Sequence, residues 1–199
     1  TADHVVEVPA PTGDDAQLLG VMDTIPREGH HFVVMHIMGS HLRYGDRYPT
    51  VFPVIPAENN RISEYDTSIA YTDHILQKMT EKARETLHAS VIMYVSDHSE
   101  DMKYTHGTGH FTFDMTRIPL WIYLSPSYQQ KHKEKAESLR RHESCVFTND
   151  LVFDTLCGLI GADNYGRTEA YDLSSPSYAL TEKEALTMHG KVRISDDVH

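Results

Sequence analysis

The sequence lacks any long run of apolar residues. No stretch of its 199 residues approaches the roughly 20 consecutive apolar positions that a membrane-spanning helix needs. The first residues, Thr1-Ala2-Asp3-His4, also lack the charged and then apolar layout of a signal peptide. We therefore expect the chain, as given, to be soluble.

Basic residues are few. Eighteen Lys and Arg stand against 29 Asp and Glu, which gives a formal net charge of -11. A surface of this sign repels the phosphates of nucleic acids and anionic lipid surfaces, so we expect no nucleic-acid partner. Local basic patches remain open, at Arg43 and Arg47 for instance.

Cysteine is scarce as well, with only Cys145 and Cys157 in the chain. Two interpretations stay open: two small hydrophobic residues in the core, or a single disulfide. The pair therefore gives no indication of the cellular compartment.

The sequence does hold enough apolar material for a core. Hydrophobic residues make up 40% of the chain, which fits one globular domain. Residues 1–29 combine prolines and charges without a sustained period, so we expect a lead-in along the surface, with one short helix near 17–23. Residues 30–199 are expected to form the domain proper.

Helical periodicity is clearest from Ile62 to Ala83, where apolar or small residues recur every three or four positions. Ser63 and Asp66 resemble a capping box at the start of this helix. Two further helices are expected, an exposed charged one over 129–141 and one over 151–160 that ends at Gly161.

Strands are expected between these helices, at 31–38, 91–95, 118–124 and, as an edge strand, near 192–194. Strands separated by helices predict a three-layer α/β/α sandwich. Whether its sheet is mostly parallel or mixed stays open.

The most informative run is Val91-Ile92-Met93-Tyr94-Val95-Ser96-Asp97-His98, which changes abruptly from apolar residues to an acid and an imidazole. In open α/β sheets, functional residues gather beyond the carboxyl ends of strands. Adjacent residues can both turn toward one ion there, because side-chain alternation stops where the ladder ends. The alternative is that Asp97 caps a turn and His98 is a solvated loop residue.

Other histidines accompany this pair. The expected strand at 31–38 contains His36 and leads into Gly39-Ser40-His41, and His106-Gly107-Thr108-Gly109-His110 follows the pair. The chain has 14 His, so some clustering is expected by chance. The histidines named here differ from the other histidines of the chain because glycines lie near them in the sequence and expected strands precede them.

Four motifs in order resemble a known family: His36-Ile37-Met38-Gly39-Ser40-His41, Arg47-Tyr48-Pro49, Tyr65-Asp66-Thr67-Ser68-Ile69-Ala70-Tyr71-Thr72-Asp73 and Ser96-Asp97-His98-Ser99-Glu100. The series is similar to the phosphoethanolamine transferases of the sulfatase and alkaline phosphatase superfamily, over roughly residues 30 to 160. Two positions depart from the usual pattern, Thr67 in place of Asn and Ser99 in place of Gly. The resemblance implies an alkaline-phosphatase-like fold, incomplete in this chain.

The resemblance also implies the site. Asp97 and His98 would bind zinc, whose preference for imidazole and carboxylate ligands agrees with the two residue types. His110 is the favoured later ligand, while His106, which carries the His-Gly match, is its neighbour and contacts the substrate. His36 and His41 would line the same pocket, although a buried structural role for His36 stays open.

The implied reaction is a two-step transfer through a phospho-threonine, from a phospholipid donor to a lipid or glycan of the cell envelope. The family's nucleophile lies upstream, and no segment between Thr1 and Arg27 resembles it. We therefore expect this chain to be the carboxy-terminal part of a membrane-anchored, extracytoplasmic (periplasmic) enzyme, inactive alone. A sulfatase or phosphodiesterase-type hydrolase of the same superfamily and a binding domain without chemistry are the alternatives.

Overall fold

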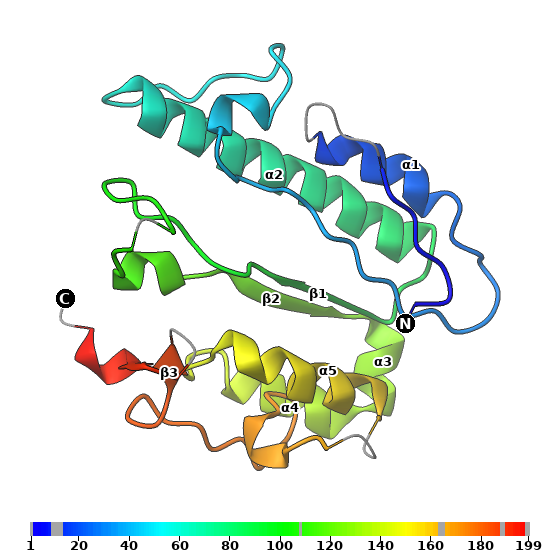
Figure 1. The fold of residues 1–199 in the computed structure, drawn as a ribbon. Helices are drawn as coiled ribbons and strands as arrows, with labels where there is room; N and C mark the ends of the chain where they lie inside the picture. Colours follow the sequence, from blue (N-terminus) through cyan, green and yellow to red (C-terminus); the bar gives the residue numbers. More distant parts are fainter. Residues whose placement is uncertain (1, 9–13, 108, 163–165, 188–189, 198–199) are drawn as a thin grey trace. The chain divides into compact units, whose positions relative to one another are not determined.

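The computed structural model describes residues 2–8, 14–107, 109–162, 166–187 and 190–197 (Figure 1). Its contacts divide the chain into two compact units, Thr1–Ala89 and Ser90–His199. This division is finer than the single domain expected from the length and the composition.

The first unit is built on α2 (Asn60–Glu85), against which the short helix α1 (Leu18–Met22) packs. Two 3-10 turns complete it, η1 (Asp15–Gln17) and η2 (Tyr44–Asp46). Both helices were expected, but the capping box was wrong. The helix begins before Ser63, and the Asn59 side chain accepts a hydrogen bond from the Ile62 N–H at 3.0 Å.

The core of this unit forms where Met22 of α1 meets Tyr71, Ile75 and Met79 of α2. The buried face of α2 is rotated from the expected stripe, since Ile69 is 46% exposed while Ser68 is fully buried. Burial of Ser68 is tolerated because its hydroxyl donates to the Tyr65 carbonyl within the same helix, at 2.7 Å. Hydrogen bonding, as well as hydrophobicity, therefore decides this face.

The strand expected at 31–38 was wrong, because these residues form no strand in the structure. Phe32, Val33 and Val34 are 47–77% exposed, whereas Met35 and Ile37 pack against the core. A strand forms only where its backbone makes ladder hydrogen bonds to a neighbouring strand, and the described part of this unit contains no strand that could be that neighbour.

The second unit centres on β1 (Val91–Val95) and β2 (Leu120–Leu124), both expected. They pair antiparallel, with Val91 opposite Leu124 and Val95 opposite Leu120. On one face of this ladder lie α3 (Pro126–Lys131), α4 (Lys133–Arg141) and α5 (Val152–Ile160) (Figure 1). A second antiparallel ladder joins β3 (Leu186–Thr187) to β4 (Val192–Arg193). The described residues of this unit also form 3-10 turns, η3 (Phe113–Thr116), η4 (Asn149–Leu151) and η5 (Glu169–Tyr171) between these elements and η6 (Ile194–Asp196) after β4.

The helices of this unit follow the sequence with one difference. The charged helix expected over 129–141 is divided at His132, and Ala136 and Ser138 on its second half are buried. As expected, α5 ends at Gly161, whose φ of +75° favours glycine. Both cysteines are free thiols, Cys157 buried and Cys145 exposed, so the disulfide is absent and only Cys157 is a core residue.

Candidate functional site

Asp97 and His98 come one residue after β1, at the end of the ladder where β2 begins. The Asp97 side chain is 86% exposed and that of His98 is 41% exposed. One carboxylate oxygen of Asp97 (Oδ1) accepts the His98 backbone N–H at 3.0 Å, and the other (Oδ2) lies 3.9 Å from His98 Nε2. The two side chains therefore face each other beyond the end of the strand.

Hydrogen bonds hold the backbone around this pair. The Ser96 hydroxyl donates to the His98 carbonyl at 2.7 Å, and the Asn149 side-chain amide donates to the Asp97 carbonyl. His98 Nδ1 lies 2.9 Å from the Ser99 carbonyl. Because a carbonyl only accepts, Nδ1 is the donor of this hydrogen bond, and Nε2 is the ring nitrogen that faces Asp97.

Glu100 is a functional candidate that the sequence analysis missed. Its side chain is 5% exposed and accepts two hydrogen bonds from His106, from the backbone N–H at 2.6 Å and from Nδ1 at 2.9 Å. Because a carboxylate only accepts, Nδ1 of His106 carries a proton in this contact, and Glu100 fixes the tautomer and the orientation of the ring. The available signal was the position of Glu100 in the same motif as Asp97 and His98.

This contact brings two imidazoles together. The ring of His106 lies over that of His98, with centroids 4.4 Å apart and an interplanar angle of 39°. In both rings Nδ1 makes a hydrogen bond within the loop, to the Ser99 carbonyl from His98 and to Glu100 from His106. The structure therefore unites Asp97, His98 and His106.

The same loop is folded on itself by Asp101. Its carboxylate accepts the backbone N–H groups of Lys103 and Tyr104, at 2.7 and 2.9 Å, and the Thr112 hydroxyl at 2.8 Å. These hydrogen bonds, the one from Tyr104 first, hold the pKa of Asp101 below its usual value of 3.8. The turn formed in this way sets the position of His106.

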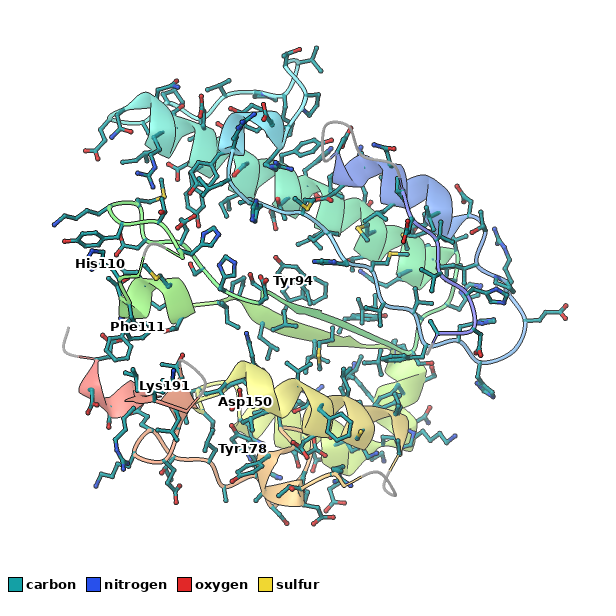
Figure 2. The ribbon with its side chains drawn as sticks, in the orientation of Figure 1. Tyr94, His110, Phe111, Asp150, Tyr178 and Lys191 are labelled. Carbon is teal, nitrogen blue, oxygen red and sulfur yellow. The ribbon has the colours of Figure 1, made fainter. Side chains whose placement is uncertain are left out.

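His110 lies further along this loop (Figure 2), where it is exposed. Its ring contacts Tyr104, with centroids 5.3 Å apart. Thr108, between the two histidines, lies outside the described residues. Thus His106 is placed beside His98, and a metal-binding role for His110 stays a prediction.

His36 and His41 belong to the first unit, and both are exposed. His41 Nδ1 lies 2.8 Å from the Leu42 carbonyl, and Arg47 Nε donates to the His41 carbonyl at 3.1 Å. The expectation that these histidines share a pocket with Asp97 stays a prediction. The buried alternative for His36 does not hold in the described structure.

The donor types at the end of β1 fit part of a zinc site. Asp97 and His98 offer a carboxylate and an imidazole on adjacent residues, and both types bind Zn²⁺. Across the described ranges, no three His, Cys, Asp or Glu side chains are grouped so that they alone could hold a metal ion. Any such site on this chain therefore needs ligands in addition to this pair.

Comparison with known proteins decides the family. The sulfatase family model matches residues 6–162, well over half of the chain. The chain belongs to the sulfatase family. The match includes Asp97, His98 and both later histidines, and it ends before β3 and β4.

Curated relatives of this sulfatase-family chain narrow the resemblance. It is 27% identical over 191 residues to phosphoethanolamine transferase EptA of Salmonella typhimurium LT2, which covers 85% of this chain and 35% of the relative. It is 25% identical over 160 residues to the Kdo(2)-lipid A phosphoethanolamine 7''-transferase of Escherichia coli K12, covering 67% of this chain and 27% of the relative. The chain thus spans about a third or less of these two relatives.

Solved structures confirm the fold of the sulfatase-family chain. The carboxy-terminal periplasmic domain of EptC from Escherichia coli, solved in complex with Zn, superposes with a TM-score of 0.68 at 19% identity, covering 89% of this chain and 55% of that one. The corresponding domain from Campylobacter jejuni gives 0.68 at 23% identity, covering 83% and 59%. The chain has the expected alkaline-phosphatase-like fold, incomplete here, and both ladders in the described residues are antiparallel.

Proposed function

We propose that this chain is the carboxy-terminal part of the catalytic domain of a zinc-dependent phosphoethanolamine transferase. The observation that carries the proposal is the grouping of Asp97, His98 and His106 at the end of β1, in a sulfatase-family chain related to transferases of this kind. The threonine nucleophile and the remaining zinc ligands would come from upstream of residue 1.

Asp97 and His98 would hold the zinc ion through a carboxylate oxygen and Nε2. When bound, zinc supplies a positive charge that lowers the pKa of a coordinated hydroxyl and stabilises negative charge on phosphoryl oxygens. The backbone hydrogen bonds of this turn keep the two ligands in place without movement during the reaction.

Of the two later histidines, we assign His106 to the site. Its ring contacts His98, and Glu100 holds it through Nδ1, which is the arrangement that orients a functional imidazole in many metal sites. His106 and His41 would contact the phosphate of the donor. The threonine would take phosphoethanolamine from the donor lipid, which leaves as the diacylglycerol, and the hydroxyl of the acceptor would then take phosphoethanolamine from the threonine. His36 is retained as a more distant lining residue, and His110 as a further candidate ligand.

The donor and acceptor we propose are those that the family resemblance implies. A phospholipid would supply phosphoethanolamine, and a lipid or glycan of the envelope would receive it. None of the helices in the described part of the chain has the length and apolar character needed to cross a bilayer. Membrane anchoring and a periplasmic location for the catalytic part therefore belong to the proposal through the relatives alone.

A second candidate is a hydrolase, because the family that matches is the sulfatase family as a whole. Such an enzyme would use the same Asp97-His98 corner but pass the group to water. Thus the two candidates differ in the acceptor of the second step.

A single assay tests both. The complete enzyme is incubated with phosphatidylethanolamine labelled in its head group, with and without a lipid A acceptor, and the labelled lipid and free phosphoethanolamine are separated. We expect label in the lipid and a loss of at least about 100-fold with Asp97→Asn, as for removal of a group that acts in the transition state. Asp73→Asn, at an exposed position of α2, is the matched control and should retain activity. Release of free phosphoethanolamine alone would support the hydrolase, and an unchanged rate in Asp97→Asn would refute both.

A further inference from the structure

Asp15 binds the backbone of the turn that carries His41 through hydrogen bonds. Its carboxylate accepts two consecutive backbone N–H groups from more than 20 positions away, Met38 N on Oδ1 and Gly39 N on Oδ2, each at 2.9 Å. Hydrogen bonds from N–H groups to an ionised carboxylate are shorter and stronger than those between neutral groups. One side chain therefore determines how two successive peptide groups are oriented.

The segment that Asp15 binds, from Met38 to His41, is a tight turn. Gly39 has a φ of +54°, and the His41 N–H bonds to the Met38 carbonyl at 3.3 Å. Added atoms at Gly39 would meet nothing within 4 Å, so the glycine is required by its backbone conformation rather than by space. On the far side of the turn, Arg47 bonds to the carbonyls of His41 and Leu42, at 3.1 and 3.3 Å. The turn is thus held from both sides.

Asp15 is itself connected to the core of its unit through its neighbour. Oδ1 of Asp14 accepts the Ala16 N–H at 2.9 Å and the hydroxyl of the buried Tyr71 at 2.8 Å. Burial raises the pKa of Tyr71, so its hydroxyl remains a donor. This chain of contacts ties η1, and Asp15 with it, to α2.

We propose that Asp15 is a positioning residue that fixes the turn bearing His41, so that the imidazole is presented to the substrate in one orientation. The proposal rests on the proposed function, in which His41 contacts the phosphate of the donor. Asp15 itself touches neither substrate nor metal in this scheme.

Two neighbouring aspartates provide a matched pair of variants. Asp15→Asn must turn an NH₂ group toward one of the two backbone N–H donors, which breaks that hydrogen bond. Asp14→Asn removes the same charge, but its Oδ1 can still accept both of its hydrogen bonds. A difference in activity or exchange between the two variants is therefore due to the lost hydrogen bond at the turn and not to the lost charge.

The test measures transfer and hydrogen exchange in the complete enzyme. We expect Asp15→Asn to lower kcat/KM by about 10- to 100-fold, as when outer partners of active-site groups are removed, and Asp14→Asn to change it by less than about threefold. Exchange at the peptide containing Met38 and Gly39 should rise about tenfold in Asp15→Asn only. In a His41→Ala background, Asp15→Asn should cost less than about twofold more, because both changes remove one interaction.

The outcomes separate this inference from the proposed function. An undiminished effect of Asp15→Asn in the His41→Ala background, or unchanged exchange at the turn, would overturn the inference. Faster exchange together with a lowered but measurable rate of His41→Ala, which Asp15→Asn lowers little further, supports it. Faster exchange in Asp15→Asn, with full activity of His41→Ala, would show that Asp15 holds the turn and would refute the role given to His41. Should Asp15→Asn not fold, Asp15→Glu, which keeps the charge but displaces the carboxylate by a methylene, replaces it with the same expectations.

Discussion

Glu100 offers the sharpest test of the candidate site, through the substitution Glu100→Gln. In the structure, its two carboxylate oxygens accept the backbone N–H and the Nδ1–H of His106 at 2.6 and 2.9 Å. Glutamine has nearly the same shape but only one acceptor oxygen, so its NH₂ group must face one of these donors. His106 then loses either its tautomer or its backbone restraint.

The size of the expected loss of activity in Glu100→Gln follows from the burial and the charge of the Glu100 side chain. A hydrogen bond to a charged partner contributes about 1.5 to 3 kcal/mol, and the 5% exposure of the Glu100 side chain leaves little room for water to replace it. Since about 1.4 kcal/mol corresponds to a tenfold change in rate, we expect kcat/KM to fall by about 10- to 100-fold. Stability should fall by no more than the loss of this one hydrogen bond.

The assay is phosphoethanolamine transfer by the complete enzyme, with the free energy of unfolding measured in parallel. Glu137→Gln, at an exposed position of α4, removes an equal charge and should leave transfer unchanged. If Glu100→Gln retains more than half of the activity while His106→Ala loses nearly all of it, the tautomer argument is refuted.

Two further predictions concern the second unit. A Cβ at Gly158 would lie 1.9 Å from Oδ2 of the fully buried Asp172, an oxygen that pairs with Arg167 at 3.0 Å. Gly158→Ala should therefore lower the free energy of unfolding by about 3 to 5 kcal/mol, the cost of disrupting a buried ion pair, as measured by urea titration followed by Trp fluorescence. Gly20→Ala, on a helix with open space around it, is the control and should be neutral or slightly stabilising. Because the pKa of Asp101 is lowered in the folded state, its stabilisation is complete above 3.8 and is lost as the pH falls through the folded value. The stability difference between the wild type and Asp101→Asn should therefore be constant from pH 7 to 5 and shrink below pH 3.8, and an equal difference at pH 3 would contradict it.

Local patterns predicted the helices and the strands β1 and β2 well, because periodicity and terminal glycines act over a few residues. They did not predict that the two strands pair antiparallel. Gly161 ends α5 through its own backbone conformation, for example. The strand at 31–38 failed for the opposite reason. Its apolar residues satisfy the propensity of a strand, but the ladder depends on a neighbour that the local sequence does not specify.

The same distinction applies to the site. Asp97 and His98 were identified from the sequence since the end of an apolar run is visible in the run itself. Glu100 was missed because its 5% exposure arises from how the loop folds around it. Spacing alone also left His106 and His110 undecided.

The amino-acid sequence by itself determined the family, the strand that presents an acid and an imidazole at its end, and the residue types suited to zinc. Only the tertiary structure decided which later histidine stands against His98. That choice depends on Asp101 folding the loop and on Glu100 binding His106, since hydrogen bonds between residues several positions apart select one backbone path among many that the same sequence pattern allows.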